Sequence, residues 1–562
     1  MSKRQPGFRD SMEWLHTWTG VVVGALLFTI FWMGTLSVFD KEIDRWMMPQ
    51  MRGSAAPVPA PSAIDIDSAI EALSAAPSEL PIEGIYLSLP TARTPVMTGY
   101  VSYAAAQEGT TARSGEESEE EAQYIARIIE PSTGEFLGEP DSHAGTSFFF
   151  PFHFRLHIPG NLGYWLVGFA ALSMLTMLIS GVIIHRKIFV DFFTFRPRKH
   201  VRRSTLDLHN VTGVLLLPFT FMFALSGLII FAGWYASLPW QFARDLAGDE
   251  TVALYDHADH YAHYEQKALG EPGELTAIAP LLAQAEAIWT ERYGQPARAD
   301  GLNIQHAGDA NALVAVRRTF PEQRVEMGQD IVYFHGVTGE QLADFTPSPI
   351  FHARQWLEGL HFVQFRHVAL RWFYFAAGLG ACVMIGTGFL FWSASRRATR
   401  AGKADPLKVR VVDSLSVGTV AGIILASVAY LVFNRLLAIF GGPEGHARAD
   451  LEALVFFIVW IGTFVHAAIR GRPAWGEQAW VIGALAVAAP VLNWLTTADN
   501  PVSAALTGHW AILAMDLVLI AFAAAAIATA RRLTRPAVST GSTRQAPDAL
   551  PVPGDSPGLA VK

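Results

Sequence analysis

Eight long apolar stretches constrain this chain more than any other feature of its sequence. Each approaches the roughly 20 apolar residues that a helix needs to cross the hydrocarbon layer of a bilayer. They fall at residues 16–39, 162–184, 209–232, 371–392, 413–440, 452–470, 478–497 and 506–530. We therefore predict a mainly α-helical integral membrane protein with about eight transmembrane helices, for which membrane lipid is the first partner.

The charged residues support this prediction and orient the chain. Only 16% of the residues are charged, whereas a soluble protein has about 25%. Lys and Arg gather in four segments: the N-terminus, the links after the second and fourth stretches, and the exit from the eighth. Eight spans place these segments on one side, and the positive-inside rule makes that side the cytoplasm. We therefore expect a multi-pass protein with both termini in the cytoplasm.

The segments between the spans define the predicted domains. Residues 40–155 and 233–360 are long and more polar, and they contain short alternating apolar runs typical of strands. Each is expected to form a small α+β extracytoplasmic domain. The predicted order is a retained anchor span at 1–39, an outer domain at 40–155, two spans around a basic cytoplasmic loop at 156–232, a second outer domain at 233–360, a fourth span at 361–395, a cytoplasmic linker at 396–412, a four-span bundle at 413–533 and a disordered tail at 534–562.

An internal repeat relates residues 1–200 to residues 201–400. The first and third spans both begin with L-H-x-x-T-G-V, at Leu15 and at Leu208. A glycine follows the histidine of each motif by 18 residues, at Gly34 and Gly227. In the second and fourth spans a glycine follows a tryptophan by 16 residues, at Gly181 and Gly388. Two parallel copies of helix, outer domain and helix are expected, related by an axis along the membrane normal.

The repeat arranges four histidines as two pairs. His16 and His209 begin their spans at the predicted cytoplasmic face, while His153 and His361 precede theirs at the outer face. A flat macrocycle with two axial positions on its metal requires opposed imidazoles of this kind. We therefore expect b-type haem in each pair, two haems in all. The alternative is that these histidines only lie in the membrane interface.

Further residues have open interpretations. His185, at the end of the second span, is an alternative or additional ligand on the cytoplasmic side. His157 and His367 are alternative or additional ligands on the outer side. Glycines near the pairs, Gly20, Gly24, Gly213 and Gly227, are expected to let a ring approach the backbone. Arg155 and Arg371 lie near the outer pair in the sequence. They are expected either to pair with haem propionates or to act as anchors in the membrane interface. His257, His260 and His263 form either a metal site or a solvated surface. The single cysteine, Cys382, excludes thioether-linked haem.

Five segments carry a resemblance to a known family: Trp14–Gly20, Ser180–Phe189, Asp191–Pro197, Leu206–Asn210 and Leu370–Phe375. Over about residues 10–400 the chain resembles the PepSY-associated transmembrane helix family, which includes iron-regulated membrane proteins and ferric-siderophore reductases. The resemblance implies PepSY-like outer domains, a bacterial inner (cytoplasmic) membrane, and haem b on the four paired histidines. Related sequences often have a histidine where this chain has Thr220, and the shorter reductases do not cover the last four spans.

These observations predict transmembrane electron transfer. A cytoplasmic reductase or a quinol is expected to donate the electron, and the acceptor is a ferric siderophore or another periplasmic acceptor, as in an oxidoreductase of iron homeostasis. The sequence has no dinucleotide-binding motif, so the donor is a separate molecule, and no catalytic side chain is assigned. The alternative is a non-enzymatic protein or sensor whose PepSY domains bind a ligand or protease. A transporter is a third interpretation, with Asp516 and Arg435 as the charges nearest midspan. A net charge of −8 gives no basis for binding nucleic acid.

Overall fold

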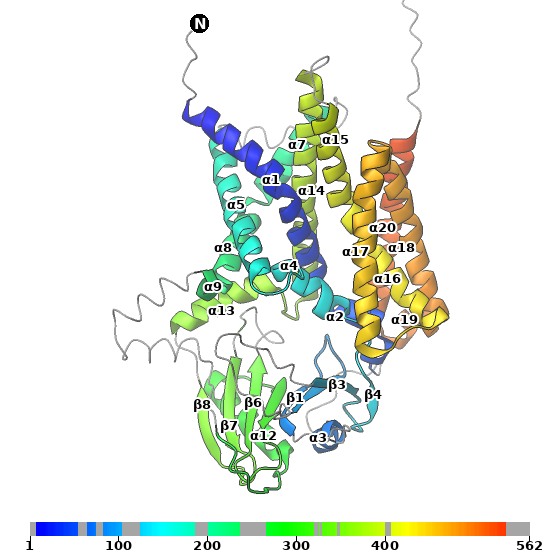
Figure 1. The fold of residues 1–562 in the computed structure, drawn as a ribbon. Coiled ribbons are helices and arrows are strands. Elements are labelled where there is room, and N and C mark those ends of the chain that lie inside the picture. Colours follow the sequence, from blue (N-terminus) through cyan, green and yellow to red (C-terminus); the bar gives the residue numbers. More distant parts are fainter. Residues whose placement is uncertain are drawn as a thin grey trace, which may run out of the picture.

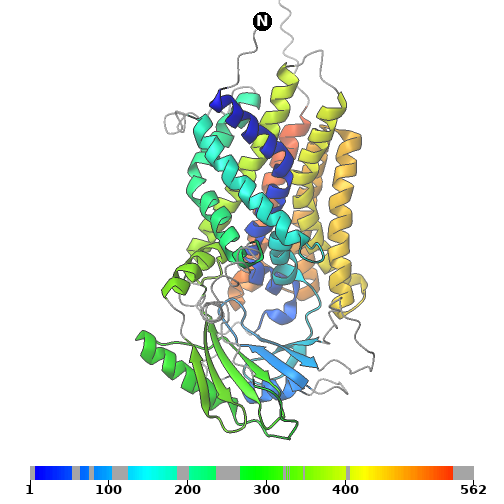
Figure 2. The same ribbon diagram turned by 60° about the vertical axis from the view of Figure 1, so that its left-hand side comes forward.

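Membrane-type helices and a single β-sheet at one end of them make up the structure (Figure 1). The computed structural model describes residues 7–53, 64–74, 82–103, 124–185, 201–235, 266–319, 325, 327, 329–345, 349–399 and 406–535. We call the end of the helices next to the sheet the sheet end, and the opposite end, where α1 begins and α20 ends, the far end (Figure 1). Figure 2 shows that the long helices all lie on the same side of the sheet.

The chain up to residue 399 supplies the helices of the core. These helices are α1 (Phe8–Ser37), α5 (Leu162–Ile184), α7 (Val201–Leu215), α8 (Leu217–Ile230) and α14 (Val368–Thr399). The expected third span, 209–232, is a broken helix, because α7 and α8 meet at an angle of 63°. Pro218 lies in the first turn of α8 and cannot continue the hydrogen-bond ladder of α7, which accounts for a break here.

Residues 406–534 add a second bundle beside the core. It contains α15 (Pro406–Val417), the π-helix η4 (Gly418–Gly422), α16 (Ile423–Phe440), α17 (Gly445–Arg470), α18 (Ala474–Thr497), α19 (Pro501–Thr507) and α20 (Trp510–Thr534). Within the described residues, seven helices are long and apolar enough to cross a membrane, and the bent pair α7–α8 makes eight if counted as one span. The prediction of a mainly helical multi-pass protein is confirmed.

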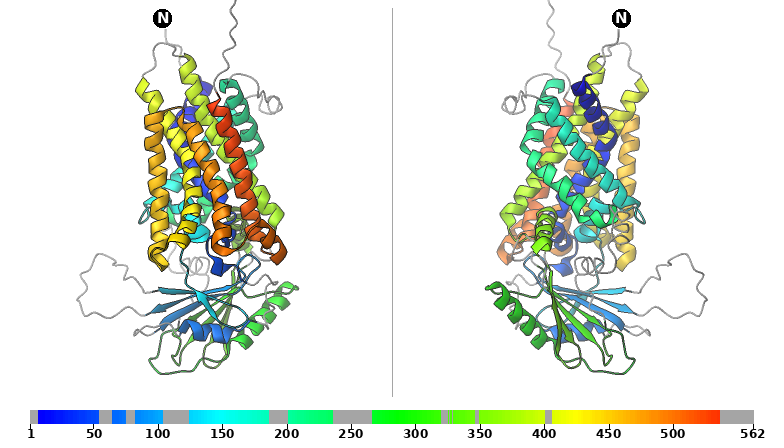
Figure 3. Two further views of the ribbon diagram at one scale, coloured as in Figure 1. Left: turned by 90° about the vertical axis from the view of Figure 1, so that its right-hand side faces the viewer. Right: turned by 90° about the vertical axis from the view of Figure 1, so that its left-hand side faces the viewer.

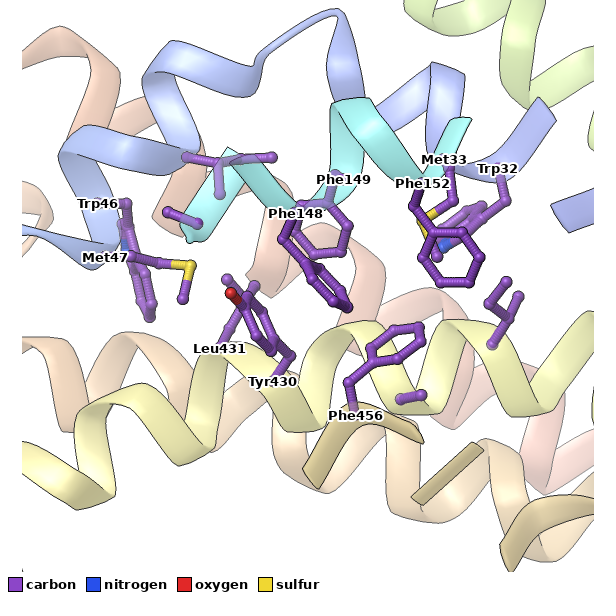
Figure 4. Close-up of a cluster of buried hydrophobic side chains, with 14 of the residues drawn as sticks. Trp32, Met33, Trp46, Met47, Phe148, Phe149, Phe152, Tyr430, Leu431 and Phe456 are labelled. Atoms are coloured by element: carbon purple, nitrogen blue, oxygen red, sulfur yellow. The ribbon is translucent and has the colours of Figure 1, made fainter. Parts of the chain in front are cut away.

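Aromatic side chains join this bundle to the core (Figure 4). Phe148 stacks on Tyr430 of α16 with ring centroids 4.7 Å apart, and it meets Phe456 of α17 edge-on at 5.0 Å. The indole of Trp32 on α1 donates a hydrogen bond of 3.0 Å to Ser427. Because lipid competes equally well for apolar surface, close packing and buried hydrogen bonds of this kind hold membrane helices together.

Strands from both outer segments form one antiparallel sheet. They are β1 (Ile82–Ser88), β2 (Met97–Tyr103), β3 (Tyr124–Ile129), β4 (Phe136–Gly138), β5 (Gly301–Gln305), β6 (Leu313–Thr319), β7 (Gln329–His335) and β8 (Gln341–Phe345). The strand order is β4-β3-β2-β1-β5-β6-β7-β8, so β1 pairs with β5, with Tyr86 opposite Asn303. The two segments expected to form domains therefore contribute four strands each to one sheet, and their junction removes an exposed edge from each half.

Two helices cover the face of the sheet that points away from the membrane helices (Figure 3). They are α3 (Ile66–Ser74) and α12 (Ile278–Tyr293). Leu73 of α3 and Trp289 of α12 are fully buried in one continuous core with Ile85 of β1 and Leu302 of β5. The two halves of the sheet therefore share a core and behave as one unit.

Short helices lie between the sheet and the long helices. They are α2 (Asp40–Met47), η1 (Pro49–Met51), the π-helix η3 (Ala144–Phe149), α4 (Phe150–Arg155), α9 (Ala232–Tyr235) and α13 (Pro349–Phe362). Contacts of α4 with α1, of α13 with α8 and of α2 with α20 join them to the bundle. Both ends of the expected first outer domain, 40–155, therefore pack on the membrane helices. The basic loop from 186 to 200 and the tail after 535 lie outside the described residues.

A buried ion cluster fastens the sheet to the core. Arg93, in the loop between β1 and β2, pairs with Asp40 at 3.0 Å and with Glu42 at 2.6 Å. Arg371 of α14 pairs with the other oxygen of Glu42 at 2.6 Å. Burial raises the pKa of Glu42, but Arg93 and Arg371 outweigh burial and hold that pKa at about 2. The carboxylate therefore remains charged and bridges two arginines from different parts of the fold.

A second polar cluster fastens α2 and the segment after it to the C-terminal bundle. Arg52 pairs with Asp499 and donates hydrogen bonds to Asn493 at 3.0 Å and to the carbonyl of Trp46 at 3.1 Å. The indole of Trp46 donates to Asp516 of α20 at 2.8 Å. Asp516, which the sequence alone placed near midspan, therefore lies where α2 meets the bundle at the sheet end.

Candidate functional site

The core brings the predicted histidine pairs together, one pair at each end. His16 of α1 and His209 of α7 meet at the far end with ring centroids 6.3 Å apart and ring planes at 81°. His153 of α4 and His361 of α13 meet at the sheet end at 5.9 Å and 39°. When two imidazoles bind one metal from opposite sides, each ring centre lies about 3 Å from the metal, because the bond is about 2 Å long and the nitrogen lies about 1 Å from the ring centre. The two ring centres are then about 6 Å apart. Both pairs have this spacing.

All four imidazoles are anchored in the same way. In each one Nδ1 lies within hydrogen-bond distance of an oxygen on a helix of the same half of the core: His16 with Met177 O at 3.0 Å, His209 with Met384 O at 2.7 Å, His153 with Ile30 O at 2.8 Å and His361 with Ser226 Oγ at 2.8 Å. A carbonyl can only accept, so Nδ1 carries the proton. The Ser226 hydroxyl donates its proton to Met222 O at 2.6 Å, and it therefore accepts from His361. The unprotonated Nε2 of each ring remains for a metal, and the anchored Nδ1 fixes the orientation of the ring.

Burial keeps the sheet-end pair neutral. Burial lowers the pKa of His153, and burial together with the neighbouring His153 lowers the pKa of His361 to about 3. An imidazole must be neutral to bind a metal. The shift favours the neutral form of both imidazoles, which is the form that binds a metal.

Four glycines make room for the four rings. An added Cβ would lie 2.7 Å from the His153 ring at Gly34, 3.1 Å from the His361 ring at Gly227, 3.3 Å from the His16 ring at Gly181 and 3.4 Å from the His209 ring at Gly388. These glycines are the ones that recur at equal spacings in the sequence, so the signal for their role was present. Of the glycines first expected to admit a macrocycle, Gly227 lies beside an imidazole and lines the sheet-end cavity, while Gly20, Gly24 and Gly213 line the far-end cavity.

Each pair opens into a mainly apolar cavity of about 380 Å³. The far-end cavity is lined by helices α1, α5, α7, α8 and α14, and its polar side chains include Glu13, His185 and Asn210. The sheet-end cavity is lined by Gly34, Phe150, Phe231, Tyr235 and Tyr374, among others. Apolar walls around a pair of imidazoles at this spacing suit a flat macrocycle that already holds its metal in four equatorial positions.

The remaining histidines that the sequence singled out do not form a pair of this kind within the described residues. His185 follows the last residue of α5 and lines the far-end cavity. His157 donates a hydrogen bond of 2.8 Å from Nε2 to Phe148 O, and its ring stacks on the Phe148 ring, outside the lining of the sheet-end cavity. His367 is exposed just before α14. His257, His260 and His263 lie outside the described residues.

The two arginines expected near the outer pair have separate environments. Arg371 is 4% exposed and is engaged by Glu42, while Arg155 is exposed on α4. Among the described residues no group of three or more His, Cys, Asp or Glu side chains has the arrangement of a metal site. The histidine pairs are therefore the candidate ligands that the structure offers.

Fold and sites together define a polytopic membrane protein whose core carries a pair of partly buried histidines at each end. The sequence profile described as the PepSY-associated TM region matches residues 13–394, and the chain belongs to this family. It is also similar to a protein of Pseudomonas aeruginosa called "Uncharacterized protein PA4219", with 26% identity over 320 residues, which cover 54% of this chain and 74% of the relative. The matched part contains both histidine pairs and ends before the C-terminal bundle.

Proposed function

We propose that this protein carries electrons across the bacterial inner membrane through two b-type haems. One haem is held by His16 and His209 and the other by His153 and His361. The observation that carries the proposal is the geometry of the pairs, with ring centroids 6.3 Å and 5.9 Å apart and every Nδ1 anchored to a protein oxygen. Two opposed neutral imidazoles are the axial ligand set of a b-type haem that transfers electrons.

The matching environments of the pairs support a duplicated core. Gly34 lies against His153 as Gly227 lies against His361, and Gly181 lies against His16 as Gly388 lies against His209. The repeat in the sequence relates the two glycines of each set. A duplicated hairpin that binds one ligand at each end gives two sites of equal design, as expected for parallel repeats.

The spacing of the two sites suits a conduit. From His16 to Ile30, whose carbonyl anchors His153, α1 rises about 21 Å at about 1.5 Å per residue. The hydrocarbon layer is about 30 Å thick, so the sites lie toward its two boundaries. Bound haem iron supplies one-electron chemistry between the ferrous and ferric states. The four histidines would hold the haems through Nε2, and the apolar walls of the cavities would exclude water.

The direction of transfer follows from the predicted orientation. With both termini in the cytoplasm, the far-end site accepts an electron from a cytoplasmic reductase or a quinol. The sheet-end site then delivers the electron to an acceptor outside, for which a ferric siderophore is the proposed class. The eight-stranded sheet lies on this side, where it is placed to meet the acceptor (Figure 1).

A difference spectrum of purified protein and its paired variants tests the proposal. Reduced-minus-oxidised spectra of the wild type are expected to contain the α-band of b-type haem. His153→Ala with His361→Ala removes the sheet-end contribution, His16→Ala with His209→Ala removes the far-end contribution, and each double variant keeps the other. Replacing His367, which is exposed, by alanine is the matched control and leaves the spectrum unchanged. A folded, colourless wild type would refute the proposal and favour a non-enzymatic ligand- or protease-binding role.

A further inference from the structure

The two cavities of the core meet at a single layer of side chains. Among the described residues, Leu27 of α1 and Met174 of α5 line both the far-end cavity and the sheet-end cavity. Each of these side chains is 2% exposed and packs in the main buried cluster of the core. A group bound at one end and a group bound at the other would therefore both reach the same two side chains.

The repeat in the sequence gives smaller residues at the corresponding positions of the other half of the core. Thr220 follows His209 by eleven residues, as Leu27 follows His16, and Ala381 follows Trp372 by nine residues, as Met174 follows Trp165. Thr220 and Ala381 are each 1% exposed. The Thr220 hydroxyl donates its proton to Leu216 O at 2.9 Å, so it presents no unsatisfied donor. None of the four residues carries an ionisable group.

We propose that Leu27 and Met174 form the bridge through which an electron passes between the two sites, and that the layer blocks water and protons. The inference rests on the proposed function. With haem bound at both sites, one electron would pass from a ferrous far-end iron to a ferric sheet-end iron, so that the first would be oxidised and the second reduced. No bond forms or breaks and no proton moves. Electron tunnelling is faster through packed atoms than through empty space, whereas a proton needs hydrogen-bonded groups or water, which an apolar packed layer excludes.

If Leu27 and Met174 form the bridge, the rate of electron transfer should depend on the volume of the side chain at position 174 and not on its thioether. Leu27→Ala combined with Met174→Ala removes both bridging side chains and leaves a void between the cavities. Met174→Leu conserves volume, which buried sites tolerate well, and it removes only the thioether. The single variants Leu27→Ala and Met174→Ala each keep one bridging side chain, so they provide intermediates if the double variant folds poorly.

The test uses the full-length protein in vesicles with a reductant trapped inside and ferricyanide outside. The double alanine variant is expected to keep both haems and the iron–iron distance measured by pulsed electron paramagnetic resonance, but to pass electrons several-fold more slowly. Met174→Leu is expected to match the wild type. A trapped pH dye, which needs no electron transfer, is expected to report a faster passive proton leak through the double variant.

Two results would overturn the bridge while leaving the proposed function intact. The first is a double alanine variant that holds both haems and has the electron flux and proton leak of the wild type. The second is Met174→Leu as slow as the double variant, which would assign the effect to the sulfur atom. A wild type without haem would overturn the proposed function itself and the bridge with it.

Discussion

Replacing Gly34 by alanine tests whether the sheet-end pair is built to hold its imidazoles at a fixed position. The added Cβ would lie 2.7 Å from both Cε1 and Nδ1 of His153, whereas ordinary contact begins at 3.4 Å. The ring must therefore move by about 0.7 Å, which exceeds the tolerance of about 0.2 Å for a metal–ligand distance. The same shift weakens the 2.8 Å hydrogen bond from Nδ1 to Ile30 O.

The helix itself gains from this substitution, which separates the effect on the site from the effect on the fold. Alanine stabilises a helix interior by up to about 1 kcal/mol over glycine, so Gly34→Ala is expected to fold at least as well as the wild type. Haem per chain, measured as pyridine haemochrome, should fall by half, and one component should disappear from a redox titration. Gly388→Ala is the matched control, because its Cβ would lie 3.4 Å from His209 and both haems should remain. Full haem content with unchanged potentials in Gly34→Ala would refute the reasoning.

Three further predictions concern single contacts. Ser226→Ala removes the hydroxyl that accepts a hydrogen bond from His361 and should weaken haem binding at the sheet end by about tenfold. The measurement is the rate of haem transfer to apomyoglobin. An equal loss of haem affinity at both ends would contradict the prediction. The folded protein lowers the pKa of Glu42 from its ordinary 4.5 to about 2, so the ionised carboxylate contributes about 3 kcal/mol of stability above pH 4.5, and this stability is lost as the pH falls from 4.5 through 2. The melting temperature of Glu42→Gln should therefore fall less steeply than that of the wild type over that pH range. Equal slopes would argue against the ion cluster. Arg52→Ala leaves Asp499 without its buried partner and should cost about 3 kcal/mol of stability, which a melting temperature equal to that of the wild type would exclude.

The apolar stretches and the internal repeat of the sequence predicted the membrane spans and the two histidine pairs. A transmembrane helix must be apolar over its whole length, so the spans could be read from composition, apart from the break between α7 and α8. The L-H-x-x-T-G-V repeat then paired His16 with His209, and its counterpart before the second and fourth spans paired His153 with His361. Ligands at helix ends are predictable when symmetry fixes which ends meet.

Contacts between distant segments could not be predicted in the same way. The junction of β1 with β5 joins residues more than 200 positions apart, and no local pattern distinguishes a strand at an open edge from one that is paired. The salt bridges of Glu42 with Arg93 and Arg371 depend on where the sheet docks. The glycines under the imidazoles were visible as spacings, but their role required knowing which ring each one faces.

Haem stoichiometry of the purified full-length protein tests the central claim most directly. Pyridine haemochrome analysis, combined with amino-acid analysis for protein concentration, should give two b-type haems per chain. A well-folded preparation that contains no haem, even when it is produced with haem in excess, would contradict the assignment of both histidine pairs and the electron-transfer function that depends on them.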